Sequence, residues 1–155
     1  MWPLNSNMIL LHVEASTYCN ARCPLCPRSL YGYKVEGVWP EVHLSVNKFE
    51  KCLERFPARE YVYFNGHLGD PMMNPDIVAL AKLTKCRTSI TTNGSIGTQK
   101  TWEDLAKNKI EVKFSIDGLE DTNHLYRQDV QWNKIMERVK WFIGAGGHAI
   151  WKWIP

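Results

Sequence analysis

A regular alternation of strand-like and helix-like segments constrains the fold of this chain more than any other feature of its sequence. Five runs rich in apolar, aromatic and β-branched residues are expected to form strands, at residues 8–15, 61–65, 88–92, 110–116 and 149–154. Amphipathic segments between them are expected to form helices, at residues 45–56, from 74, from 101 and at 131–143. Strict alternation of this kind predicts parallel strands joined by right-handed helical crossovers.

Helical spacing of apolar side chains and typical helix-start residues support the four helices. Ser45 can cap the first, whose predicted apolar face includes Cys52. The second is expected to begin at Asn74-Pro75-Asp76, where asparagine caps, proline occupies the first position and aspartate complements the helix dipole. The third is expected to begin at Thr101. The second helix is expected to bury Ile77, Leu80 and Ala81. The apolar residues expected on the faces of the next two helices are Trp102, Leu105, Ala106, Ile135, Val139 and Phe142.

Chain length and composition limit the architecture further. Apolar residues make up 45% and charged residues 23% of the 155 residues, which is typical of a globular domain. A closed eight-stranded barrel needs about 250 residues, and no helix follows the last expected strand. The prediction is therefore an α/β fold, with about five parallel strands and four helices over residues 1–155. It is either an open sheet or, as we favour, the first part of a larger (β/α) barrel.

Charge and cysteine content exclude several classes of protein. The net charge of +3 is too small to indicate binding to nucleic acid or a membrane surface. No run of about 18 apolar residues is present, and the first residues lack the basic start of a signal peptide. The five cysteines are an odd number, and three of them fall within eight residues, which fits a disulfide framework poorly. We therefore expect a cytoplasmic protein that keeps these cysteines for a metal.

The three clustered cysteines form the segment Cys19-Asn-Ala-Arg-Cys23-Pro-Leu-Cys26, directly after the first expected strand. Thiolates are soft ligands that suit zinc or iron–sulfur clusters. A structural zinc site takes four ligands, and no fourth cysteine or histidine follows at short spacing. Three thiolates on a four-iron cluster would leave one iron open for a substrate or cofactor. The alternatives are zinc with a distant fourth ligand such as His43, or unligated thiols.

This C-x3-C-x2-C segment after the first strand resembles the signature of the radical S-adenosylmethionine (SAM) enzymes. The resemblance implies that Cys19, Cys23 and Cys26 bind a [4Fe–4S] cluster whose fourth iron is chelated by S-adenosylmethionine. It places Leu25 where the backbone of this family meets the adenine. It also implies a partial barrel of usually six strands, of which this sequence supplies only the first five.

Further segments that resemble this family follow the next three expected strands. Gly69 and Asp70, in Asn65-Gly-His-Leu-Gly69-Asp70-Pro71, resemble the Gly-Gly-Glu-Pro segment that receives the methionine amino group, with aspartate in place of glutamate. Asn93, in Thr91-Thr92-Asn93-Gly94, resembles a stretch near the cofactor. The next strand ends in Phe114-Ser115-Ile116-Asp117-Gly118. The cofactor contacts that the resemblance to the peptide- and protein-maturase (SPASM-like) branch implies there are Ser115 for the ribose, Asp117, and Arg127 for the methionine carboxylate.

The resemblance also implies the reaction. The reduced cluster of these enzymes transfers one electron to the sulfonium, which releases methionine and a 5′-deoxyadenosyl radical that abstracts hydrogen from a substrate. A flavodoxin- or ferredoxin-like electron donor and a peptide or small-molecule substrate are then expected partners. Two other readings stay open: a non-catalytic iron–sulfur or zinc module, and a half-barrel that another chain completes by pairing with the exposed last strand.

Overall fold

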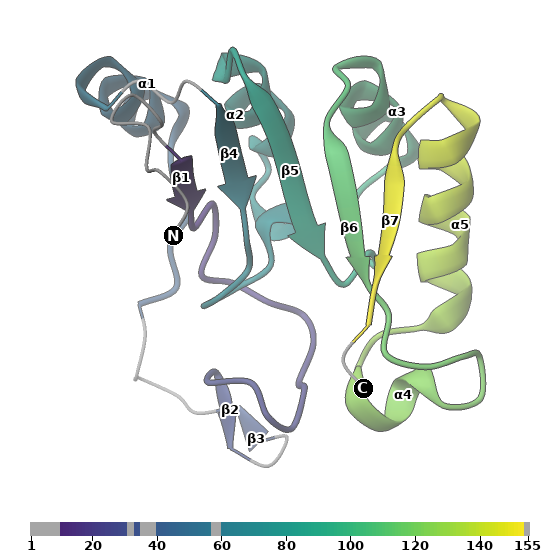
Figure 1. The fold of residues 1–155 in the computed structure, drawn as a ribbon. Helices are drawn as coiled ribbons and strands as arrows, with labels where there is room; N and C mark the ends of the chain where they lie inside the picture. The colour runs from purple at the N-terminus through teal and green to yellow at the C-terminus, as the bar shows by residue number, and fades with distance from the viewer. Residues whose placement is uncertain (1–9, 31–32, 35–39, 57–59, 154–155) are drawn as a thin grey trace, which may run out of the picture.

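The computed structural model describes residues 10–30, 33–34, 40–56 and 60–153 and contains one central parallel sheet (Figure 1). Its strands are β1 (Leu10–Val13), β4 (Tyr61–Phe64), β5 (Arg87–Thr92), β6 (Glu111–Ser115) and β7 (Ala149–Lys152). They lie in the order β1-β4-β5-β6-β7, and every neighbouring pair is parallel. The predicted five-stranded parallel α/β architecture, a partial barrel, is confirmed.

The longer helices form one layer against this sheet. They are α1 (Val46–Arg55), α2 (Ile77–Leu83), α3 (Gln99–Lys107) and α5 (Trp132–Gly144). Each contacts the next along the chain: α1 packs on α2, α2 on α3, and α3 on α5. This is the arrangement expected when each crossover between parallel strands has the same hand. No helix in the described part of the chain is long and apolar enough to span a membrane.

The loops that follow the strands gather at one end of the sheet. In Figure 1 the arrowheads point toward the end where the cysteine segment and the short helix α4 (Asn123–Tyr126) lie. A small antiparallel hairpin of β2 (Ser29–Leu30) and β3 (Tyr33–Lys34) lies at the same end. The 3-10 helix η1 (Pro71–Met73) follows the β4 loop. The sequence pattern did not predict these short elements, because each is only one turn or two residues long.

The core lies between the sheet and the helices and is rich in aromatic rings. Trp102 of α3 is fully buried and stacks on Phe114 of β6, with ring centroids 5.3 Å apart. Phe142 of α5 packs edge-on against both rings, at 6.1 Å from each. The indole Nε1 of Trp102 donates a hydrogen bond to the carbonyl of Ile96 at 3.0 Å. The tryptophan therefore joins two helices and a strand.

Replacing Trp102 by alanine is expected to lower the free energy of unfolding by about 3–5 kcal/mol, because a large cavity opens in the core. The measurement is urea unfolding followed by circular dichroism. Trp153 provides the matched control, since its side chain is exposed. Trp153→Ala should change the free energy of unfolding by no more than about 0.5 kcal/mol. Equal losses in the two variants would contradict this account of the core.

Three local expectations about the helices need correction. Cys52 is exposed rather than on the buried face of α1, because α1 lies at the end of the helix layer and buries only a narrow stripe around Phe49. Helix α2 begins at Ile77, and Asn74 does not cap it. Helix α3 begins at Gln99, two residues earlier than expected, with the side chain of Thr98 capping it.

Candidate cofactor site

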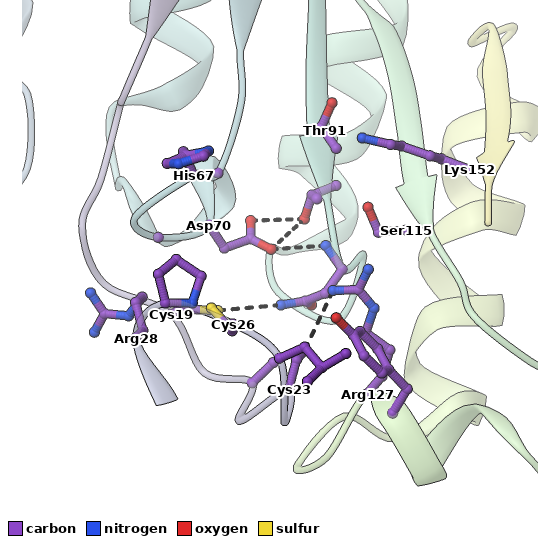
Figure 2. A pocket seen from close by; sticks show the side chains of 18 residues that line it. Cys19, Cys23, Cys26, Arg28, His67, Asp70, Thr91, Ser115, Arg127 and Lys152 are labelled. Atoms are coloured by element: carbon purple, nitrogen blue, oxygen red, sulfur yellow. Dashed lines mark hydrogen bonds between the residues drawn. The ribbon is translucent and has the colours of Figure 1, made fainter. Parts of the chain in front are cut away.

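A cavity of about 260 Å³ opens at the carboxyl ends of the strands, where ligand sites of parallel α/β folds gather. Figure 2 shows side chains from the loops after β1, β4 and β6 and from the end of β7 directed toward it. Of the residues predicted to bind metal or cofactor, the structure brings together Cys19, Cys23, Leu25, Cys26, Gly69, Asp70, Asn93, Ser115 and Arg127. Asp117 does not line this cavity, but its carboxylate is bonded to Arg127, which does.

The cysteine segment is held in place by two arginines. Arg28 is buried and donates to the backbone carbonyls of Thr17 and Leu68, the latter at 2.7 Å. It also pairs with Glu41 at 3.0 Å. On the other side of the segment, Arg22 pairs with Asp129 beyond α4. These contacts fix the segment between the loops after β4 and β6.

The three cysteines at the cavity carry free thiols in unequal surroundings. Burial raises the pKa of the Cys19 thiol to about 12, and the negative charge of Asp70 adds to this effect. Burial also raises the pKa of Cys23, although the guanidinium of Arg127 opposes the shift. Thiols that bind iron or zinc lose their protons. Metal binding at this site would therefore release protons from Cys19 and Cys23.

The described part of the chain holds no preformed set of ligands for a single metal ion. Among the residues that the structure describes, no three His, Cys, Asp or Glu side chains converge as ligands of one metal ion would. In an iron–sulfur cluster each thiolate can bind a different iron, so the sulfurs need not meet at one point. His43 does not line the cavity: its Nδ1 lies 3.0 Å from the Ser16 hydroxyl, and its ring packs on Tyr18. The geometry therefore does not support a zinc site with His43 as the fourth ligand.

The loop after β4 is held against the start of the cysteine segment. The carboxylate of Glu14 accepts hydrogen bonds from the backbone N–H groups of His67 and Leu68, at 2.9 and 3.2 Å. Gly69 packs so closely there that an added Cβ would lie 2.2 Å from the carbonyl oxygen of Ser16. Only glycine fits this position without moving the backbone.

Gly69→Ala is therefore expected to lower the free energy of unfolding by about 1–3 kcal/mol, because the methyl group forces the two loops apart. Thermal unfolding of the purified protein measures the change. Gly144→Ala is the control, since an added Cβ at the end of α5 meets no atom within 4 Å. A Gly69→Ala protein as stable as Gly144→Ala would show that the two loops are not tightly apposed.

Asp70 links the loops after β4 and β5 from a buried position. Its carboxylate accepts hydrogen bonds from the Thr92 hydroxyl and from the backbone N–H groups of Met72 and Asn93, at 2.8–3.0 Å. Burial raises the pKa of Asp70, and these hydrogen bonds oppose the shift. The dashed lines at Asp70 in Figure 2 mark its contacts with the β5 loop. The carboxylate thus joins the loop after β4 to the end of β5.

Arg127 lies between the cysteine segment and the loop after β6. Its Nε donates to Asp117 at 2.5 Å, and its Nη1 donates to the Cys23 sulfur at 3.4 Å. The Asp117 side chain is almost completely buried, and that of Arg127 is 15% exposed. The guanidinium is therefore oriented by a buried carboxylate and faces the cavity.

Sequence reasoning missed several residues that line the cavity. Lys152, at the end of β7, points toward Thr91 and Ser115 in Figure 2 and is the register partner of Ser115. The other missed lining residues are Ala21, Pro27, Arg28 and Tyr126. Gly66, His67, Thr91 and Thr92 also line the cavity and belong to the two segments that the resemblance placed near the cofactor. Position supplies a usable signal for Lys152, because it ends the fifth strand as Ser115 ends the fourth.

Comparisons with known proteins agree with this geometry. The model of the radical SAM superfamily matches residues 13–152. The tungsten-containing aldehyde ferredoxin oxidoreductase cofactor-modifying protein of Pyrococcus furiosus is 28% identical over 153 residues, covering 91% of this chain. The chain spans 41% of the length of that relative.

Solved structures share the fold. Native anSMEcpe with bound AdoMet has a TM-score of 0.72 at 21% identity, covering 92% of this chain and 43% of that one. SuiB of Streptococcus suis bound to S-adenosylmethionine has a TM-score of 0.74 at 24% identity, covering 93% of this chain and 33% of that one. Enzymes of the matched family use a [4Fe–4S] cluster and S-adenosylmethionine. With nearly its whole length matched, this chain belongs to the radical SAM superfamily.

Proposed function

We propose that this chain is the cluster- and cofactor-binding part of a radical SAM enzyme. Cys19, Cys23 and Cys26 would hold the [4Fe–4S] cluster, and S-adenosylmethionine would occupy the cavity beside them. The observation that carries the proposal is that these three cysteines share one cavity with Arg127 and Asp70. Once reduced by an electron donor, a cluster bound there would supply the one electron needed to cleave S-adenosylmethionine into methionine and a 5′-deoxyadenosyl radical.

The chain's own residues would bind and orient the cofactor. Arg127 would bind the methionine carboxylate, because a guanidinium offers two parallel N–H donors to a carboxylate. The carboxylate of Asp70, which is buried but lines the cavity next to Gly69, would receive the amino group of the methionine moiety. Ser115 would meet the ribose. The backbone at Leu25, whose side chain is exposed at the cavity mouth, would contact the adenine.

The substrate would enter along the sheet face opposite the helices. On this face the Tyr63 ring stacks with His12 at 5.0 Å and with Tyr61 at 4.1 Å between ring centroids. The ammonium of Lys113 lies 5.1 Å from the Tyr63 ring. Lys113 is also the register partner of Thr91, which lines the cavity, so this face continues from the site. Such a polar and aromatic surface suits a peptide better than a small apolar molecule.

A peptide substrate also agrees with what one structure of similar fold binds. A similar solved structure, native anSMEcpe, holds both AdoMet and the Kp18Cys peptide, with a TM-score of 0.71 at 19% identity. We propose a peptide or protein as the substrate and a flavodoxin- or ferredoxin-like protein as the electron donor. The substrate and the electron donor are proposed for the whole enzyme, because this chain covers only 42% of the length of that structure.

Electron paramagnetic resonance on anaerobically reconstituted, dithionite-reduced protein tests the proposal. The expected result is a reduced four-iron signal that changes shape when S-adenosylmethionine is added, because the cofactor binds the open iron. A cluster signal that ignores the cofactor would leave a non-catalytic cluster module as the better description. Zinc in place of iron and sulfide would overturn the proposal.

A further inference from the structure

The side chain of Asn93 lies between the loop after β5 and the cysteine segment. It is 3% exposed. Its Nδ2 donates to Oδ1 of Asn20 at 2.9 Å and to the Cys19 sulfur at 4.0 Å, a contact that a dashed line marks in Figure 2. Asn20 itself is the neighbour of Cys19 in sequence. Asn93 therefore reaches both the cysteine and the residue that follows it.

The other end of the same carboxamide is also engaged. Its Oδ1 accepts hydrogen bonds from the backbone N–H and the hydroxyl of Ser95, at 3.0 and 2.6 Å. The Ser95 hydroxyl accepts in turn from Nδ2 of Asn20 at 2.9 Å. Asn20, Asn93 and Ser95 thus form a closed ring of side-chain hydrogen bonds that fixes the orientation of the Asn93 amide.

This ring leaves Asn93 no free group for a bound cofactor. A carboxamide has two N–H donors and an oxygen that accepts two hydrogen bonds. In Asn93 one N–H faces Asn20, the other faces the Cys19 sulfur, and the oxygen takes both donors of Ser95. Its contacts therefore run to the cysteine segment and its own loop.

A second N–H group approaches a cysteine sulfur from the loop after β6, at the end of α4. Nη1 of Arg127 lies 3.4 Å from the sulfur of Cys23. Within the described ranges, the structure gives Cys26 no side-chain N–H donor of this kind. The three sulfurs are therefore in different hydrogen-bonding surroundings. Hydrogen bonds to cluster sulfurs are among the factors that set the reduction potential.

We propose that Asn93 is a positioning residue for the cluster: it orients Cys19 and donates an N–H···S hydrogen bond to it, rather than contacting S-adenosylmethionine. This rests on the proposed function, because Cys19 must bind iron. An N–H donor stabilises the reduced cluster, which carries one more negative charge, over the oxidised one. Asn93 therefore raises the reduction potential of the cluster.

An anaerobic redox titration of the reconstituted protein, followed by electron paramagnetic resonance, tests this inference. Asn93→Ala keeps the backbone N–H that binds Asp70 and is expected to shift the midpoint potential to more negative values. Ser95→Ala loosens the ring but leaves the Asn93 amide next to Cys19, so a much smaller shift is expected. Asn65→Ala is the matched control: Asn65 directly follows β4 and binds Thr91 and His12, and no shift is expected.

Iron content and circular dichroism separate the possible outcomes. Asn93→Ala protein that folds but loses iron, while Ser95→Ala and Asn65→Ala keep it, also supports the inference, because Cys19 is then misplaced. Asn93→Ala protein with the parent's iron content and the parent's midpoint potential overturns it. Equal shifts of the midpoint potential in Asn93→Ala and Ser95→Ala would also overturn it, because Asn93 would then only stabilise the loop and would not act on Cys19 through its own N–H group. A parent protein that takes up no iron would instead refute the proposed function.

Discussion

The Cys23→Ala protein is expected to hold almost no iron or sulfide after anaerobic reconstitution, while the parent holds a full cluster. Cys23 is buried at the cavity and its sulfur lies next to Arg127. With two thiolates left, one more iron of the cluster would lack a protein ligand, and no other cysteine lines the cavity to replace it. Iron and acid-labile sulfide per chain, together with the visible absorbance, measure the loss.

Cys52→Ala is the matched control for this experiment. Cys52 is exposed on α1, outside the cavity, and its replacement should leave the iron and sulfide content unchanged. Circular dichroism of both apo-proteins should match the parent, because Cys23 is buried at the cavity rather than in the core cluster between sheet and helices, and Cys52 is exposed. A Cys23→Ala protein that loads like the parent would show that the cluster, if any, is held elsewhere. Loss of iron in both variants would point to nonspecific damage.

The overall fold could be predicted because the sequence repeats one simple signal. Each apolar run that was expected to be a strand contains one, and β1, β4, β5, β6 and β7 pair in chain order. This regularity comes from parallel strands that alternate with helices along the chain, and the central strands bury apolar residues such as Val62, Ile90 and Val112 against the helix layer. The buried positions predicted on α2 and α3 are confirmed for the same reason, since one face of each helix covers the sheet.

Local details escaped prediction where contacts between distant segments override helix signals. Asn74 has the character of a cap, yet its Nδ2 donates to the carbonyls of Ala15 and Leu44, at 2.6 and 2.9 Å. Those carbonyls are 59 and 30 residues away, so the sequence around Asn74 contains no sign of them. Cys52 has helical spacing from Phe49, yet Phe49 is buried and Cys52 is exposed.

At the candidate site, too, the lining residues could be predicted from the sequence, but the contacts between them could not. Cysteine spacing and the polar residues at strand ends identified the walls of the cavity, because parallel strands bring their ends together. What the sequence could not show is which side chains bind one another. The bond between Asp70 and Thr92, and that between Asn93 and Asn20, arise from loops that meet only in three dimensions. The roles assigned to Asp70, Ser115 and Arg127 remain predictions for experiment.

Arg127→Met is expected to weaken the binding of S-adenosylmethionine to the cluster-loaded protein by roughly 10- to 150-fold, the equivalent of about 1.5–3 kcal/mol for a lost charged hydrogen bond. The guanidinium faces the cavity and Asp117 fixes its orientation, so it is held where the methionine carboxylate would bind. Isothermal titration calorimetry under anaerobic conditions measures the affinity. Arg127→Lys should recover only part of it, because an ammonium lacks the paired donors of a guanidinium.

The buried carboxylate of Asp117 requires a further variant in this experiment. Removing Arg127 alone leaves a buried charge without its guanidinium, which destabilises the protein whatever Arg127 does for the cofactor. Arg127→Met combined with Asp117→Asn removes that charge, so its stability should recover toward the parent while its cofactor affinity stays low. Lys100→Met is the control for a general charge effect, because Lys100 is exposed on α3, outside the cavity, and pairs with Asp104. If the double variant binds S-adenosylmethionine as tightly as the Lys100→Met protein, Arg127 orients the cysteine segment and some other group receives the carboxylate.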